Sequence, residues 1–195
     1  LYKIRNKKIL RLKTDAKIFF KTLLNKKIQK IDYKYLSEWM MYCNATFKKF
    51  PHIEKIAHAD KNNFINSYRF IDKLSNYYRK NECIVTDSGT ALLSGHQVSK
   101  LKKNQKMFTS QGLAEMGCGL PGAIGASFAR NKGEIICLNT DGSIMMNLQE
   151  LQTIDHYKLP IKTFIFNNDG YLMIKHTQKN LFSGRYSAVN KKTDV

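Results

Sequence analysis

Acidic residues are scarce in this sequence, and several features that would define a protein class are missing. The 195 residues include 15 Asp and Glu against 33 Lys and Arg, a net charge of +18. The four cysteines form no CxxC pair. This excludes a zinc ribbon or dithiol redox motif, and we expect reduced packing thiols in a cytoplasmic protein. No apolar run approaches the roughly 20 residues of a membrane span, and no signal-peptide pattern occurs, so we expect no membrane partner.

The excess of positive charge raises the question of an anionic partner. A basic protein attracts nucleic acid or an anionic membrane surface through its long-range field. Here the lysines are scattered along the chain, and no basic motif interleaved with aromatic residues occurs. We therefore expect solvated lysines and no nucleic-acid partner. A basic nucleic-acid-binding module stays as the alternative, and it predicts salt-sensitive retention on RNA or DNA.

The most informative stretch lies between residues 134 and 171. Two short β-prone runs, Glu134–Asn139 and Ile161–Phe166, enclose a segment in which Leu148, Leu151 and Ile154 have helical spacing. This alternation predicts a βαβ unit. Because a helical crossover connects parallel strands, the two strands are expected to be parallel neighbours.

Small and polar residues follow each of these predicted strands. Asp141 and Gly142 follow the first strand, and Asn168 and Gly170 follow the second. Each turn alone is more often only a turn. Together, however, the two turns lie at the same edge of the sheet, where ligands bind in open α/β folds. Magnesium prefers oxygen ligands and commonly shares them with phosphates, so the pair predicts a cation and phosphate site.

This stretch resembles the Gly-Asp-Gly … Asn-Asn signature of thiamine diphosphate enzymes, and it is most similar to the acetolactate synthase group. The resemblance implies Mg²⁺ bound by the Asp141 carboxylate, the Asn168 amide oxygen and the Gly170 carbonyl. One departure is Thr140, which stands where the signature has its first glycine and would crowd the diphosphate. The resemblance also implies cofactor contacts from the residues next to these ligands: Gly142, Ser143, Tyr171, Leu172 and Met173.

A second loop of small residues follows a predicted buried strand, Cys83–Thr86. Such a loop lets the backbone approach a phosphate closely. Many acetolactate synthases carry Gly-Gln-His here, whereas the Gly-Thr-Ala of this chain is closer to related decarboxylases. Beyond the loop, we favour a structural or surface role for His96 over that of a catalytic base. The resemblance implies a diphosphate-binding loop formed by Ser88, Gly89, Thr90 and Ala91.

A glycine-rich stretch covers residues 108–126. Its glycines would make a poor isolated helix, but small residues on one helix face allow very close packing. We interpret Gly122, Gly125 and Ala126 as sites of tight packing between a helix and the sheet.

The same stretch resembles the segment that bends the cofactor in this family. There, a large apolar side chain lies between the two cofactor rings, and a nearby backbone carbonyl accepts a hydrogen bond from the 4′-amino group. The resemblance implies Met116 for the side chain and Ala114 for the carbonyl, as the candidate catalytic positions. A long, flexible methionine is suited to such an irregular gap.

Ile174 bears on the reaction type. In relatives that only decarboxylate, an acid at this position protonates the intermediate, and an apolar side chain lacks that proton. The resemblance therefore implies thiamine diphosphate-dependent decarboxylation of a 2-keto acid, with pyruvate as the leading candidate. The product is then joined to a second carbonyl compound (carboligation). The alternative is a simple 2-keto acid decarboxylase of the same superfamily. Two interpretations remain for three further residues, namely contacts with the substrate or a place on a solvated helix face. These residues are Lys175, His176 and Gln178.

The first 80 residues carry structural signals only. We expect a short strand-like piece at Ile9–Leu12, and then a packing helix capped by Thr14 or Asp15. Its inner face is expected to comprise Ile18, Phe19, Leu23 and Leu24. Residues 33–66 have weak periodicity and are interpreted as a linker with helical portions. Residues 66–80 predict a helix, capped by Asn66 or Ser67, with one apolar face of Phe70, Ile71, Leu74 and Tyr78.

These signals predict an α/β protein with a three-layer α/β/α arrangement and a mainly parallel sheet, preceded by a helical linker. By resemblance, residues 1–32 are the tail of the family's central domain, residues 33–80 a linker and entry helix, and residues 81–195 a thiamine diphosphate-binding domain that is incomplete at its C-terminus. The start at Leu1 instead of Met indicates a missing N-terminal part.

Nothing in the sequence matches the family's pyrimidine-binding domain, whose glutamate the chemistry requires. We therefore expect this chain to hold half an active site and to need a homodimer, a homotetramer or a partner chain. The resemblance leaves FAD binding open. An inactive remnant or partner subunit stays as a further alternative.

Overall fold

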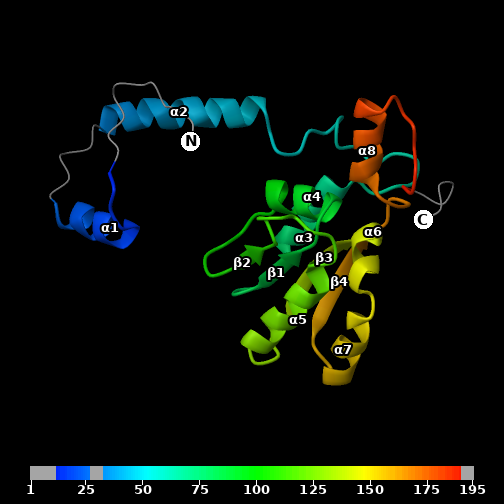
Figure 1. Cartoon of the computed structure of the whole chain (residues 1–195). Helices are drawn as coiled ribbons and strands as arrows, with labels where there is room; N and C mark the ends of the chain where they lie inside the picture. Colours follow the sequence, from blue (N-terminus) through cyan, green and yellow to red (C-terminus); the bar gives the residue numbers. More distant parts are fainter. Residues whose placement is uncertain (1–11, 27–32, 190–195) are drawn as a thin grey trace. The chain divides into compact units, whose positions relative to one another are not determined.

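The computed structural model describes residues 12–26 and 33–189, which form two compact units, residues 1–49 and 50–195 (Figure 1). Each unit is considered by itself. Among the described residues, no helix has both the length and the apolar character needed to cross a membrane. The predicted strand-like piece at Ile9–Leu12 lies almost entirely outside the described residues.

The first unit contains two helices, α1 (Ala16–Asn25) and α2 (Tyr33–Lys49). Asp15 caps α1 as expected, because its Oδ1 accepts hydrogen bonds from the backbone N–H groups of Lys17 and Ile18 at 2.9 and 3.4 Å. The prediction that α1 buries an apolar face is wrong within this unit. Ile18, Leu23 and Leu24 are exposed, and the helix buries none of its residues.

Helix α2 is one of the helical portions expected within residues 33–66. Residues 33–49 form one continuous helix, and only the following residues, up to Asn66, are turns. The sequence of α2 lacks a clean apolar stripe, but it also contains no Pro and no Gly, so nothing in it interrupts the backbone hydrogen bonds.

The second unit contains a sheet of four parallel strands. These are β1 (Cys83–Thr86), β2 (Lys106–Phe108), β3 (Ile135–Thr140) and β4 (Ile161–Phe166), in the order β2-β1-β3-β4. The predicted pairing of the last two strands is confirmed, with Ile135 opposite Ile161 and Thr140 opposite Phe166. The carboxyl ends of β3 and β4 therefore lie next to each other.

Helices cover both faces of this sheet, which confirms the three-layer arrangement (Figure 1). Because side chains alternate along a strand, Ile84 and Leu138 face helices α3 (Ser67–Asn76) and α4 (Thr90–Val98), while Val85 and Cys137 face the opposite side. That side is covered by α5 (Gly119–Ala129) and, at its margin, by α7 (Glu150–Tyr157).

Helix α3 belongs to the core of the second unit. Asn66 caps it as predicted, and its Oδ1 accepts from Tyr68 N at 3.0 Å. Of the predicted apolar face, Ile71 is fully buried on the helix and Tyr78 is buried just beyond its end, while Phe70 and Leu74 pack against the same cluster. The helix ends at Asn76, earlier than the predicted Lys80.

The glycines of α5 differ from one another in their surroundings. A Cβ at Gly122 would lie 3.2 Å from Val85 Cγ1, which confirms tight packing on β1. Ala126 packs partly against the same core. The prediction is wrong for Gly125, where a Cβ would meet no atom within 4 Å. Helix periodicity turns residue 125 away from the sheet, while residues 122 and 126 face it.

The cysteines allow a first test of the core. Burial raises the pKa of the Cys137 thiol to about 12, and it also raises the pKa of Cys83. Thiols react as thiolates, and a raised pKa together with burial leaves little accessible thiolate. We therefore expect Ellman's reagent at about pH 8 to label only the half-buried Cys43 of these three cysteines in the native protein. Cys83 and Cys137 should react only in urea. Peptide mass spectrometry after labelling checks this, and rapid native labelling of Cys137 would contradict the packing described.

Candidate cofactor and metal site

The site begins where β3 and β4 end, and one carboxylate joins the two strand ends. Asp141 directly follows β3, and its Oδ2 accepts hydrogen bonds from Asn168 N at 3.3 Å and from Gly170 N at 2.8 Å. Both of these residues follow β4. The structure thus brings together Asp141, Asn168 and Gly170, which the sequence predicted as neighbours.

Two oxygen atoms at this junction have no hydrogen-bond partner among the described residues. They are Asp141 Oδ1 and Asn168 Oδ1, and both are buried. The orientation of the Asn168 amide is supported by its Nδ2, which lies 3.4 Å from Thr90 Oγ1. Leaving buried oxygens unsatisfied is costly, and such atoms call for an explanation, such as an ion. The residues present therefore fit a hard cation.

This donor set is of the type that suits magnesium. Within the described part of the chain, no three His, Cys, Asp or Glu side chains gather into a metal site. A site for zinc or iron would need such a group. One carboxylate, one amide and a backbone carbonyl suit magnesium, which commonly completes its octahedron with water and phosphate oxygens.

The loop after β1 lies across from this junction. Gly89 has φ +80° and precedes α4, where a left-handed conformation favours glycine. Thr140, the departure from the family signature, is nearly buried and donates its hydroxyl to Ser88 O at 3.4 Å. A Cβ at Gly89 would lie 3.6 Å from the Thr140 side chain. The Thr140 side chain thus packs between the two loops. It occupies space that would be empty if residue 140 were the glycine of the family signature.

A cavity of about 240 Å³ is enclosed by these loops. It is lined by most of the predicted cofactor contacts, and Thr140 and Ile174 line it as well. Three predicted residues do not line it. Ala91 is fully buried in the core, Ala114 lies outside, and Asp141 lies beside the cavity. The predicted residues that line it are Ser88, Gly89, Thr90, Met116, Gly142, Ser143, Asn168, Gly170, Tyr171, Leu172 and Met173.

Two of these positions are constrained by close packing. A Cβ at Gly142 would lie 2.5 Å from the ring of Tyr171, so the aromatic residue packs directly on the glycine backbone. Met116 is 37% exposed and borders the cavity, as expected for a side chain that contacts a ligand there. Ala114 has φ +53°, an unusual conformation for a residue with a side chain.

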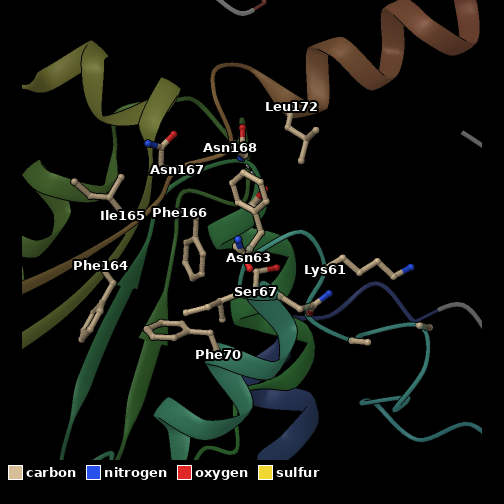
Figure 2. A pocket seen from close by; sticks show the side chains of 16 residues that line it. Lys61, Asn63, Ser67, Phe70, Phe164, Ile165, Phe166, Asn167, Asn168 and Leu172 are labelled. Carbon is tan, nitrogen blue, oxygen red and sulfur yellow. Dashed lines mark hydrogen bonds between the residues drawn. The ribbon is translucent and has the colours of Figure 1, made fainter.

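Figure 2 shows a larger cavity, of about 840 Å³. Thr90, Asn168 and Leu172 line both this cavity and the smaller one. The wall of the larger cavity includes a cluster of phenylalanine rings. The ring of Phe70, from α3, lies 5.6 Å from Phe164 and 5.7 Å from Phe166. The sequence predicted Phe70 on the apolar face of a helix and Phe164 and Phe166 within a strand, and no motif in the sequence indicates this cavity.

Four residues considered for a site role in the sequence, among them His96, lie outside the smaller cavity. His96 Nε2 lies 3.0 Å from Thr86 Oγ1, and partial burial lowers the pKa of His96. These contacts fit the structural role that the sequence favoured. On α8 (Leu172–Leu181), Lys175 lies over the ring of Tyr186 and Gln178 hydrogen-bonds Ser187. His176 contacts Asn180 on the same helix.

Sequence reasoning missed a buried carboxylate beside the site. Asp87 directly follows β1, is fully buried, and accepts hydrogen bonds from Gly117 N at 3.0 Å and Gly119 N at 2.9 Å. The available signal was an acidic residue between an apolar strand and a loop of small residues. Such a carboxylate needs several donors if it is buried.

Residues 87–195 match the family model "Thiamine pyrophosphate enzyme, C-terminal TPP binding domain". This match covers more than half of the chain, and the chain therefore belongs to that family. The resemblance noted in the sequence is confirmed.

Curated relatives include acetolactate synthase large subunits. The protein of Cyanidium caldarium is 34% identical over 180 residues, which are 91% of this chain and 30% of that protein. The isozyme 2 subunit of Escherichia coli is 38% identical over 107 residues, 54% of this chain and 20% of that protein. The chain thus spans less than a third of the length of these relatives.

A solved structure supports the fold. The thiamine diphosphate-dependent 4-hydroxybenzoylformate decarboxylase of Rhodococcus jostii superposes with a TM-score of 0.57 and 21% identity, over 65% of this chain and 24% of that one. At this identity, the likeness concerns the arrangement of the sheet and helices. It agrees with the parallel α/β fold described above.

Proposed function

We propose that this chain binds thiamine diphosphate and Mg²⁺ as part of an acetolactate synthase-like enzyme. That enzyme decarboxylates a 2-keto acid, with pyruvate as the leading candidate, and joins the product to a second carbonyl compound. The proposal is supported most by the two buried oxygens without partners at neighbouring strand ends, Asp141 Oδ1 and Asn168 Oδ1. When bound, the cofactor supplies the electron sink that allows CO₂ to leave.

The residues of the chain divide the binding between them. Asp141, Asn168 and the Gly170 carbonyl would hold the cation, and the loop at Ser88–Thr90 would approach the diphosphate. Met116 would contact the organic rings. Ser88–Thr90, Asn168, Gly170 and Met116 line the smaller cavity, and Asp141 hydrogen-bonds Gly170 next to it.

Ile174 favours carboligation over simple decarboxylation. Its apolar side chain lines the smaller cavity, in the position where the family's decarboxylases carry an acid. Without a proton donor there, the reactive carbon is not readily protonated and stays available to a second carbonyl. A 2-keto acid decarboxylase is therefore the weaker candidate.

A binding experiment tests the cofactor assignment. Isothermal titration calorimetry of the chain with thiamine diphosphate should show binding in Mg²⁺ and none in excess EDTA. Thiamine, which lacks the anionic tail, serves as the control ligand and should not bind under either condition. Equal binding with and without Mg²⁺ would contradict the cation site.

A turnover experiment tests the reaction. We expect no consumption of pyruvate by the chain alone, because the resemblance implies a second domain that binds the pyrimidine ring. In an assembly that also supplies this domain, NMR of the products should show acetolactate in excess over acetaldehyde. Acetaldehyde as the main product would favour the decarboxylase alternative.

The high positive charge of the chain is the observation behind the alternative of a nucleic-acid-binding module, which can be tested directly. A nucleic-acid-binding module predicts retention on RNA or DNA that falls with salt and survives Asp141→Ala. We expect no retention in a buffer of physiological ionic strength.

A further inference from the structure

A loop between β2 and α5 is held by a buried carboxylate. Asp87 Oδ1 accepts from Ser88 N at 2.6 Å and from Gly117 N at 3.0 Å, and its Oδ2 accepts from Gly119 N at 2.9 Å. Asp87 has no exposed surface. Three backbone donors stabilise a charge that would otherwise be costly to bury, so the loop and the end of β1 are tied together.

The same loop is held from the other side by an amide. Asn147, the last residue of the 3-10 helix η1 (Met145–Asn147), donates Nδ2 to Gly117 O at 2.7 Å. The N–H of Gly117 therefore binds Asp87, and its carbonyl binds Asn147. Gly117 has φ +89°, and a Cβ there would lie 2.6 Å from Met146 Cβ, so the position accepts only glycine.

Met116 directly precedes this doubly held residue. Its side chain lines the smaller cavity, whereas neither Asp87 nor Asn147 does. Asn147 can therefore act on a ligand only through the backbone of the loop that carries Met116, whereas Asp87 also holds Ser88 N in the loop assigned to the diphosphate. Their bonds restrict the backbone immediately after Met116 and so its position.

We propose that Asp87 and Asn147 are positioning residues, which hold the Gly117 backbone and thereby set Met116 against the organic rings of the cofactor. This inference rests on the proposed function, because it takes thiamine diphosphate as the ligand. It separates two parts of the site. The strand ends with Asp141 and Asn168 would bind the diphosphate and Mg²⁺. Asn147 would act on ring binding alone, while Asp87 would act on ring binding and, through Ser88 N, on the diphosphate loop.

Calorimetric titration with two ligands, thiamine diphosphate and inorganic pyrophosphate, each with Mg²⁺, tests this separation. Asp87→Asn should raise the Kd for thiamine diphosphate about tenfold, because an amide has one acceptor oxygen and leaves either Gly117 or Gly119 without a partner. The Kd for pyrophosphate should rise much less, because Asp87 reaches the diphosphate loop only through Ser88 N, from which the remaining oxygen can still accept. A residue that only stabilised the fold would change both affinities together.

A second variant guards against loss of folding. Asn147 is partly exposed, so Asn147→Ala lets water replace the lost bond to the Gly117 carbonyl and should preserve the circular dichroism spectrum. It should also weaken only thiamine diphosphate binding, and it decides the question if Asp87→Asn does not fold. Glu134→Gln, at the start of β3 and thus at the opposite end of the sheet, is the matched control and should change neither affinity.

Hydrogen exchange gives a readout that needs no ligand. In both variants, the backbone amides of residues 114–119 should exchange faster than in the wild type, while those of β3 should not. If the variants bind both ligands like the wild type, or lose both equally, the positioning role is overturned. If the wild type binds pyrophosphate but not thiamine diphosphate, or neither, the proposed function fails and the inference fails with it.

Discussion

Replacing Asp141 with alanine is expected to abolish Mg²⁺-dependent binding of thiamine diphosphate. One oxygen of this carboxylate accepts from the backbone of Asn168 and Gly170, and the other is buried without a partner among the described residues. Removing an outer partner of a metal ligand typically costs about 10–100-fold in affinity. Loss of the ligand itself should therefore raise the Kd at least about a hundredfold, as measured by calorimetry.

Two further variants separate the metal role of Asp141 from its structural role. Asp141→Asn retains an oxygen that can accept from Gly170, but it loses the charge that attracts a cation. It should fold like the wild type and still bind thiamine diphosphate poorly. Asp155→Ala removes an exposed carboxylate that forms a surface ion pair with Lys158 and should leave the affinity unchanged. Wild-type affinity in Asp141→Asn would show that the carboxylate does not hold the ion.

Gly119→Ala is expected to destabilise the second unit markedly. A Cβ at this buried position would lie 2.8 Å from Asn139 Nδ2 and also 2.8 Å from Asp87 Cβ and Oδ2. Both neighbours are fully buried and cannot move aside without disturbing the core. Overpacking of this kind costs about 1–3 kcal/mol. Equilibrium urea unfolding should show the loss, and binding of thiamine diphosphate should weaken as the loop next to Met116 shifts.

Gly125→Ala provides the matched control on the same helix. A Cβ there meets no atom within 4 Å, and alanine favours a helix over glycine by about 1 kcal/mol. The free energy of unfolding should therefore stay the same or rise. If Gly119→Ala and Gly125→Ala change the free energy of unfolding in the same direction, the difference in packing described for these two glycines is incorrect.

Much of the site could be predicted from the order of residues along the chain. Asp141 follows one β-prone run and Asn168 follows the next, and a helical segment lies between them. Consecutive strands with a helical crossover are usually parallel neighbours, so their ends must meet. This rule predicted the contact between the Asp141 carboxylate and the loop of Asn168 and Gly170, which the structure contains.

Other parts of the site could not be predicted in this way. Asp87 and Asn147 each lie 30 residues from Gly117 in the chain, and no local pattern relates them. The cavity between Phe70, Phe164 and Phe166 depends on how α3 rests on β4. Gly122 and Gly125 look alike in the sequence, yet only Gly122 packs closely against the sheet.

The sequence by itself determined that the last two strands pair in parallel and which side chains stand at their ends, because these follow from periodicity and chain order over short distances. Only the folded chain shows which of these oxygens are left without partners, where the loop of Met116 is held, and how much room Thr140 leaves. Those features depend on contacts between side chains and backbone groups far apart in the chain, and distances of a few ångströms decide them.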